Sequence, residues 1–222
     1  MERVCCPNSI ESLYLSLCKS VRYVSLPRAT TTSGGGQNLK SLTIHISSCG
    51  NLKSINQLSN STHLTTLFIS FCRNMELFSD LHQLSNLNWL RIEGCESIES
   101  FPNLQLPNLT NLDVNYCKNM KAFGDLQVPN LIRWSIDNCE NIESCPDLQL
   151  SNLAMLKDMC IMRCRMIDAS FPRGLWPPNL CSLTTGGLKK PISEWGYQNF
   201  PPSLSIVPPF PFFSYISDCG QI

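Results

Sequence analysis

Thirteen cysteines and three histidines are the residues of this 222-residue chain whose side chains could bind a metal ion, form disulfides or act as nucleophiles. A zinc site closes tetrahedrally, usually on closely spaced cysteine pairs. Cys160 and Cys164 form the one pair that resembles such a motif, and His45, His63 and His82 stand apart without a regular carboxylate spacing. We therefore expect core thiols and isolated histidines rather than a metal site.

Catalytic motifs give no alternative. The triplet at 34–36 is followed by Gln-Asn-Leu-Lys, which does not complete a phosphate-binding loop. The sequence also lacks a zinc-protease motif, a nucleophile elbow and the kinase signatures. A reactive cysteine needs an exposed, electropositive setting. We expect no enzymatic activity and no cofactor in this chain.

The cysteines instead mark a period. Seven of them, at 18, 49, 72, 95, 117, 139 and 164, follow each other at intervals of 31, 23, 23, 22, 22 and 25 residues. The long first interval contains the polar stretch 30–36 (Thr-Thr-Thr-Ser-Gly-Gly-Gly), which predicts a flexible loop at 28–37. Equivalent side chains of stacked repeats point in parallel, so disulfides along the series are not expected. The odd cysteine count favours a reducing compartment.

The segments around these cysteines share one pattern, L-x-x-L-x-L-x-x-C-x-x-L-x-x-F. It is clearest at 86–101, 108–123 and 130–145, where Ile, Val, Met or Trp can replace Leu. This is the leucine-rich-repeat signature with Cys at its Asn/Cys position. The L-x-L part predicts a strand, and stacking of the units buries their apolar faces in one core. The thiol should meet backbone carbonyls where the chain turns inward.

The predicted fold class is therefore α/β, a leucine-rich-repeat solenoid with a curved parallel β-sheet on its concave face. The convex segments should be mostly irregular or 3-10, because repeats this short that contain Pro102 and Pro107 leave no room for an α-helix. We expect about eight repeats over 1–198, the last degenerate with Leu188 in the cysteine position. Residues 199–222, rich in Pro and Phe, are expected to form an atypical tail.

The positions between the framework residues of each strand should face the concave surface. They vary in type and include exposed aromatic rings and arginines, which often anchor protein interfaces. A solvated sheet with scattered aromatic residues is the alternative. The candidate protein-binding residues are Tyr14, His45, Phe68, Trp89, Arg91, Glu93, Asp113, Asn115, Arg133 and Asp137.

Composition restricts the partners. Lys and Arg total 17, as do Asp and Glu, so the chain has no basic excess to meet nucleic-acid phosphates. No apolar run approaches the roughly 18 residues of a membrane span, and Met1-Glu-Arg-Val-Cys-Cys-Pro has no secretory pattern. We expect a protein ligand, no nucleic acid and no membrane insertion.

The repeat form, ending in Ser-Phe-Pro at 100–102, resembles the C-terminal repeats of plant nucleotide-binding leucine-rich-repeat disease-resistance proteins of the coiled-coil class. The resemblance covers roughly residues 8–204 and is sharpest in Leu175-Trp-Pro-Pro-Asn-Leu180 and Glu194-Trp-Gly196.

This resemblance implies a recognition module of an intracellular immune receptor, cytoplasmic and also nuclear. Such a module senses a pathogen effector or an altered host protein, and also contacts the receptor's own nucleotide-binding domain. ATP or ADP would bind that domain, whose motifs are not in this sequence. Two alternatives are a substrate-recruiting adaptor of a ubiquitin ligase and a truncated gene product without activity.

Overall fold

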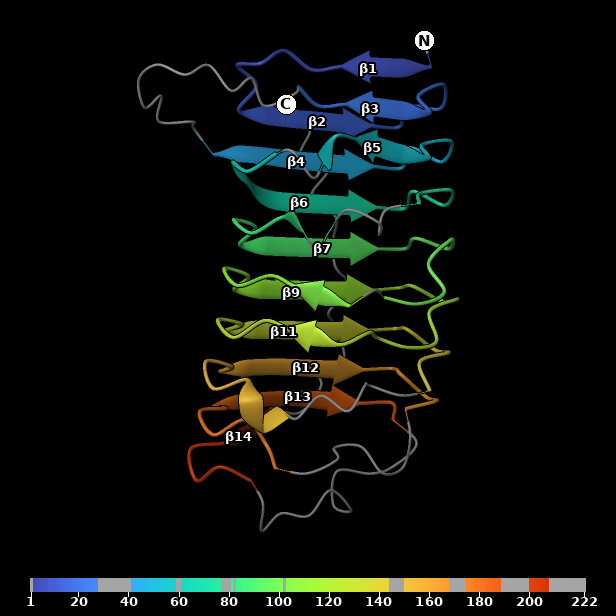
Figure 1. Ribbon diagram of the computed structural model, residues 1–222. Coiled ribbons are helices and arrows are strands. Elements are labelled where there is room, and N and C mark those ends of the chain that lie inside the picture. Colours follow the sequence, from blue (N-terminus) through green and yellow to red (C-terminus); the bar gives the residue numbers. More distant parts are fainter. Residues whose placement is uncertain are drawn as a thin grey trace, which may run out of the picture.

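A computed structural model describes residues 2–27, 41–58, 61–76, 81, 83–101, 103–143, 150–167, 175–188 and 200–207. The predicted loop at 28–37 and residues 208–222 of the predicted tail lie outside these ranges. The described residues form a parallel-strand solenoid (Figure 1). The predicted fold class is confirmed.

Nine parallel strands form the main sheet, in the order β14-β13-β12-β11-β9-β7-β6-β4-β2. Neighbouring strands from β2 to β13 belong to successive repeats, as the cysteine period predicts. The strands are β2 (Ser12–Ser16), β4 (Leu42–Ser47), β6 (Leu64–Ser70), β7 (Trp89–Glu93), β9 (Asn111–Asn115), β11 (Arg133–Asp137), β12 (Asp158–Met162), β13 (Ser182–Gly186) and β14 (Ser205–Val207).

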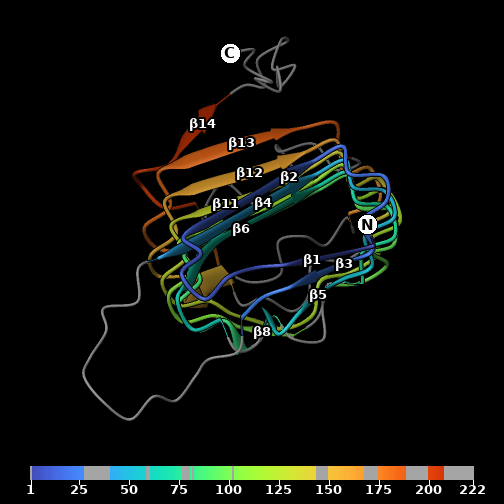
Figure 2. The same ribbon diagram turned by 90° about the horizontal axis from the view of Figure 1, so that it is seen from above.

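Short strands form a second layer across the core from the main sheet (Figure 2). Three of them pair in the order β1-β3-β5, and two more pair as β10-β8. They are β1 (Arg3–Cys5), β3 (Tyr23–Ser25), β5 (Ser54–Asn56), β8 (Leu104–Gln105) and β10 (Leu126–Gln127). A 3-10 turn, η3 (Leu150–Asn152), lies on the same side, and no α-helix occurs within the described ranges.

The core lies between these layers and uses the framework residues of the repeat. In β6, for example, Leu67 and Ile69 are fully buried, whereas the residues between and beside them face solvent. This alternation follows from the two-residue period of a strand. Because each turn contributes the same inward positions, the apolar contacts continue from repeat to repeat.

The periodic cysteines cap the strands from the core side. Each thiol donates to the carbonyl of the last residue of its strand, for instance Cys72 Sγ to Ser70 O at 3.5 Å and Cys164 Sγ to Met162 O at 3.2 Å. All but Cys18, in the first repeat, are buried. Burial raises the pKa of the Cys72 thiol to about 11 and that of Cys164 to about 12. The predicted contact of thiols with backbone carbonyls is confirmed, and these thiols act as small buried donors.

Two sets of asparagines tie each turn to the one before it. In both sets the side-chain amide donates to a backbone carbonyl of the preceding turn, at distances such as 2.7 Å for Asn74 to Gly50 and 2.9 Å for Asn108 to Ser85. One set stands two residues after the cysteine and comprises Asn51, Asn74, Asn119 and Asn141. The other precedes the framework leucine and comprises Asn86, Asn108, Asn130 and Asn179.

The residue directly before each periodic cysteine has a left-handed backbone. Its N–H donates to the last carbonyl of the neighbouring strand, as in Phe71 N to Glu93 O at 2.7 Å. Most side chains disfavour this conformation, at about 1–2 kcal/mol per residue. We call this set the strand-end row; its members are Leu17, Ser48, Phe71, Gly94, Tyr116, Asn138 and Arg163, with Gly187 in the degenerate repeat.

The C-terminal boundary differs from the expected one at residue 198. Ser205–Val207 forms β14, which pairs in parallel with β13 through Leu183 opposite Ile206. The Phe200 ring also packs against the buried Trp176, with centroids 5.0 Å apart. The start of the Pro/Phe-rich segment thus continues the solenoid, because a strand short enough to lie between prolines can still pair.

Candidate binding face

The surface predicted to be concave is the solvent face of the main sheet, where strand register arranges side chains in rows across the strands. A central row runs Tyr14, His45, Phe68, Arg91, Asp113, Ser135 and Cys160. A second row, nearer the strand ends, runs Ser16, Ser47, Ser70, Glu93, Asn115, Asp137 and Met162. A third, at the strand starts, includes Trp89, Asn111, Arg133 and Asp158. Rows form because parallel strands in register place equivalent residues side by side.

All ten candidate residues lie on this face, in strands β2 to β11. Their exposure differs. Tyr14 is 68 % exposed, and Arg133 is also exposed, whereas Asp113, Asn115 and Asp137 are buried by their neighbours. These three cannot offer a free surface and act by holding other side chains. The sequence pattern places a residue on a face but does not give the height of the side chains around it.

Aromatic rings follow one another across the first four strands of the face. The ring centroids of Tyr14 and His45 are 4.9 Å apart, those of His45 and Phe68 4.5 Å, and those of Phe68 and Trp89 4.8 Å. Contacts of this length are favourable between tilted or edge-to-face rings. The four rings therefore support each other, and a partner would meet an ordered aromatic surface.

Asp113 fixes the far end of this aromatic run. Its Oδ2 accepts from Trp89 Nε1 at 2.9 Å, from Arg91 Nε at 3.1 Å and from Arg91 Nη2 at 3.0 Å. The Arg91 guanidinium in turn lies 5.1 Å from the Phe68 centroid and 5.5 Å from that of Trp89, within cation–π range. Asp113 is thus a positioning residue that orients a tryptophan and an arginine together.

A shallow hollow of about 330 Å³ opens beside these rings. Its floor and walls come from β2, β4, β6 and β7. The lining residues are Tyr14, Leu15, Ser16, His45, Ile46, Ser47, Phe68, Ser70 and Arg91. Arg91 is the one charged side chain among them, so the hollow presents rings and hydroxyls.

Two titratable groups, His45 in the hollow and Glu93 beside it on β7, have shifted pKa values. Burial, with a smaller effect of Arg91, lowers the pKa of His45, so the ring stays neutral near pH 7. Burial also raises the pKa of Glu93; Arg91 opposes this rise, and Asp113 adds to it. A charged Glu93 is therefore an anion that its surroundings do not fully compensate.

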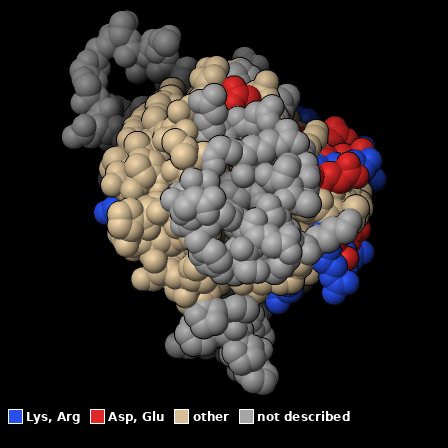
Figure 3. Space-filling view, turned by 90° about the horizontal axis from the view of Figure 1, so that it is seen from below, with Lys and Arg blue, Asp and Glu red and all other residues tan. Residues whose placement is uncertain are grey.

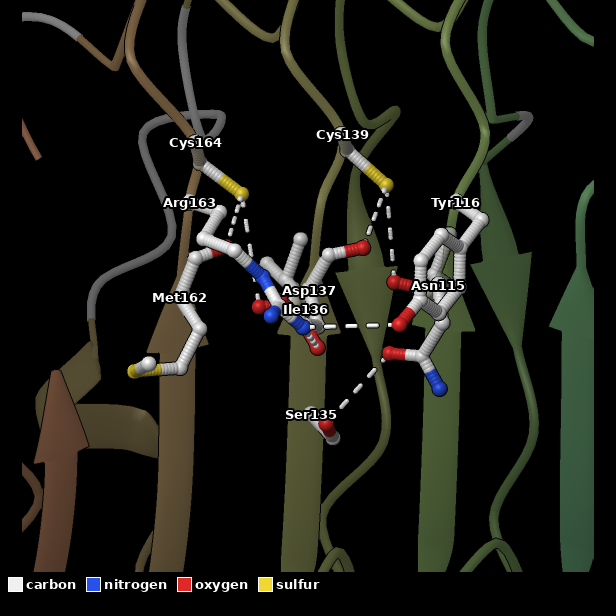
Figure 4. A network of polar contacts seen from close by, with 10 residues as sticks. Asn115, Tyr116, Ser135, Ile136, Asp137, Cys139, Met162, Arg163 and Cys164 are labelled. Carbon is white, nitrogen blue, oxygen red and sulfur yellow. Dashed lines mark hydrogen bonds and ion pairs between the residues drawn. The ribbon is translucent and has the colours of Figure 1, made fainter. Parts of the chain in front are cut away.

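The later strands carry a different, polar cluster (Figure 4). Arg163 binds both carboxylate oxygens of Asp137, with Nε to Oδ1 at 2.9 Å, and its guanidinium lies 5.9 Å from the Tyr116 ring centroid. Asn115 Oδ1 and Ser135 Oγ are 3.5 Å apart beside them. Here the polar groups satisfy one another.

Sequence reasoning missed the strand-end row as part of this face. Phe71, Tyr116 and Arg163 lie outside the predicted strand positions, yet Phe71 is half exposed and Arg163 binds Asp137. A side chain at Gly94 would collide with the Phe71 ring, so the glycine leaves room for that ring. The available signal was the variation in residue type directly before each constant cysteine.

The model of the family described as "At1g61320/AtMIF1, LRR domain" matches residues 3–185. The chain belongs to this leucine-rich-repeat family. No curated protein sequence matches it. Within the described residues, no helix has the length and apolar character that a membrane span requires.

Among solved structures, the leucine-rich-repeat domain of the type III effector XCV3220 (XopL) is similar in fold. The TM-score is 0.51 at 17% sequence identity, and the match covers 91% of this chain and 70% of that one. At this identity the likeness concerns the fold alone. Leucine-rich-repeat domains are in general non-catalytic modules for protein interaction, and they bind on the extended surface of the solenoid.

On the side of this leucine-rich-repeat domain seen in Figure 3, most visible charged side chains lie together at one edge. In the view from below, they cluster on the side where the strands of the main sheet end (Figure 3, right). Pairs such as Arg73–Glu96 at 3.3 Å and Lys121–Glu99 at 4.0 Å connect successive turns there. These exposed pairs contribute little to stability.

Proposed function

We propose that this chain is a protein-recognition module that binds a protein ligand on the solvent face of its main sheet. The observation that carries the proposal is the ordered run of Tyr14, His45, Phe68 and Trp89, ending at an arginine that Asp113 holds in place. Aromatic and arginine side chains dominate interface energies, and preorganisation lowers the entropy cost of binding.

We further propose that the module belongs to a plant intracellular immune receptor and senses a pathogen effector or an altered host protein. Two features support this: the resemblance of the Leu175–Leu180 and Glu194–Gly196 motifs to the terminal repeats of such receptors, and membership of a leucine-rich-repeat family. The receptor's own nucleotide-binding domain would be a second protein partner. A reducing location, cytoplasmic and also nuclear, suits a core that contains buried free thiols.

A photo-crosslinking amino acid placed at position 14 tests the binding face. Tyr14 is well exposed and aromatic, so the larger p-benzoylphenylalanine can replace it with its added ring pointing into solvent. Gln105, exposed on β8 of the opposite layer, is the matched control position. In irradiated plant cells we expect protein adducts from position 14 and few from position 105.

Equal adduct formation at the two positions, or none at position 14, would overturn the assignment of the face. Mass spectrometry of the adducts then tests the receptor proposal. Crosslinks to a nucleotide-binding domain or to an effector support it, and crosslinks to ubiquitin-ligase subunits alone would contradict it.

A further inference from the structure

We use the term trough for the hollow on the binding face together with the adjoining residues Glu93, Leu17 and Phe71. Ser16, Ser47 and Ser70 form its floor at consecutive strand ends, in register. Serine is small, so these positions lie low beside the ring row of Tyr14, His45 and Phe68. Beyond the serines, the strand-end row adds Leu17, 70 % exposed, and Phe71, 48 % exposed.

The trough ends at Glu93, which continues the serine row on β7. Its carboxylate accepts no side-chain hydrogen bond among the described residues, and its pKa is raised, as burial and Asp113 dictate. The nearby Arg91 guanidinium binds Asp113 instead, at 3.0 Å. Glu93, Asp113 and Arg91 together carry one net negative charge, which a cation of a partner would neutralise.

Resting on the proposed function, we propose that this trough binds an extended segment of the partner protein, with an apolar side chain packed against the rings and a lysine or arginine at Glu93. The serine hydroxyls can each donate or accept, which suits the alternating main-chain groups of such a segment. Opposite charge at Glu93 then sets the direction and register of the segment.

The dimensions of the sheet give the spacing of the motif. Neighbouring strands lie about 4.8 Å apart, so the step from the rings of β4 to Glu93 of β7 is about 10 Å. An extended chain advances about 3.3 Å per residue, so the basic residue should follow or precede the apolar one by two to four positions. A folded, flat partner surface would show no such fixed spacing.

A random-peptide phage library selected on the whole chain tests this. We expect the recovered peptides to share an apolar or aromatic residue and a Lys or Arg two to four positions apart. Fluorescence anisotropy with a recovered peptide should then show about a tenfold loss of affinity for Glu93→Gln, and a loss at least as large for Phe68→Ala. The Glu96→Gln variant, which removes a charge from an exposed turn on the same side of β7, should bind as the wild type does.

A charge exchange separates a specific contact from general attraction. The Glu93→Lys variant should lose the basic peptide and bind the same peptide with Glu in place of its Lys or Arg. Thermal melting of each variant confirms that it is folded, and the conservative Glu93→Gln change keeps the test valid if Phe68→Ala unfolds.

The inference is overturned if no peptides are recovered, if they lack the basic residue, or if Glu93→Gln and Glu96→Gln weaken binding equally. Failure of this inference can be told apart from failure of the proposed function. If position 14 still crosslinks a protein while peptides fail, the face binds a folded surface; if position 14 does not crosslink, the binding face itself is wrong.

Discussion

The first and second halves of the main sheet use one backbone design and carry opposite surface chemistry. On β2, β4 and β6 the solvent-facing residues are rings and small hydroxyl side chains, with no Lys, Arg, Asp or Glu. On β9, β11 and β12 they include Asp113, Arg133, Asp137 and Asp158, and the three carboxylates pair with Arg91, Arg163 and Arg133, respectively. The first half presents rings and hydroxyl groups that a partner can contact. In the second half, the charged side chains already pair with one another.

A shared scaffold requires that core substitutions cost the same in both halves. Ile69→Ala beneath the aromatic half and Ile136→Ala beneath the polar half each remove a fully buried side chain. We expect each to lower the free energy of unfolding by about 3 kcal/mol, measured by urea denaturation. A cost confined to one half would show that only that half is a packed solenoid.

The buried thiols offer a second comparison of the scaffold beneath the two halves. Because burial raises the pKa of Cys72 to about 11 and of Cys164 to about 12, their thiolate fractions at pH 8 are small. We expect both to react with a thiol reagent at least about 100-fold more slowly than the exposed Cys5 and Cys181. Peptide mapping after brief labelling measures this, and the difference should vanish in denaturant. Rapid labelling of Cys72 alone would mean that the aromatic half opens.

The two buried carboxylates should differ in what they control. Removing the Asp113 carboxylate as Asp113→Ala frees Trp89 and Arg91, so we expect a loss of about 2 kcal/mol together with a weaker aromatic near-UV dichroism signal. Replacing Arg163 by Gln leaves the Asp137 carboxylate without its cation. Because Asp137 is buried while Arg163 is partly exposed, this should cost about 2 kcal/mol, similar to the first variant.

The dichroism signal is the deciding readout in that pair. The Arg163→Gln variant should keep the signal of Trp89 and its neighbouring rings. If Arg163→Gln lost as much of the dichroism signal as Asp113→Ala does, the two halves of the main sheet would be coupled. The contrast between an aromatic half and a polar half would then be wrong.

The smallest effect concerns pH. His45 has a lowered pKa in the folded chain, so between that value and the ordinary 6.5 the unfolded chain binds more protons. Stability should therefore fall slightly as pH decreases from 7 to about 5.5, by about 1 °C in Tm or less, and this part should be absent in His45→Gln.

Glu93 acts in the opposite sense at lower pH. Its raised pKa means that the folded chain holds its proton more tightly above the ordinary 4.5, so acidification through that range favours the fold. Comparing Glu93→Gln with wild type below pH 5.5 separates the two groups. A Tm of the Glu93→Gln variant that rises between pH 7 and 5.5 would contradict the assignment for His45.

Much of the fold followed from the residue pattern, and much of the binding face did not. The period of Cys72, Cys95 and Cys117 gave the strand order, and the L-x-L alternation placed Phe68 on the solvent face, because these depend on local spacing. The role of Asp113 could not be read in this way. Its three hydrogen bonds come from side chains of the neighbouring strand, and the sequence pattern does not give the conformations of those side chains.

The C-terminal margin of the solenoid shows the same division. The eighth repeat, weak in sequence, still forms β13 because Leu183 is buried in the usual place. β14 was not anticipated, since its pairing depends on the edge that β13 presents rather than on a repeat of its own.

Repetition of apolar and cysteine positions was enough to specify a parallel solenoid, because each unit can bury its apolar side only against an equivalent neighbour. The side-chain contacts between neighbouring repeats were decided only in the folded structure. The left-handed backbone before each cysteine turns Phe71 and Arg163 onto the face, and strand register brings Trp89, Arg91 and Asp113 together. Such contacts join residues about one repeat apart, and their geometry depends on the twist and side-chain packing of the assembled sheet.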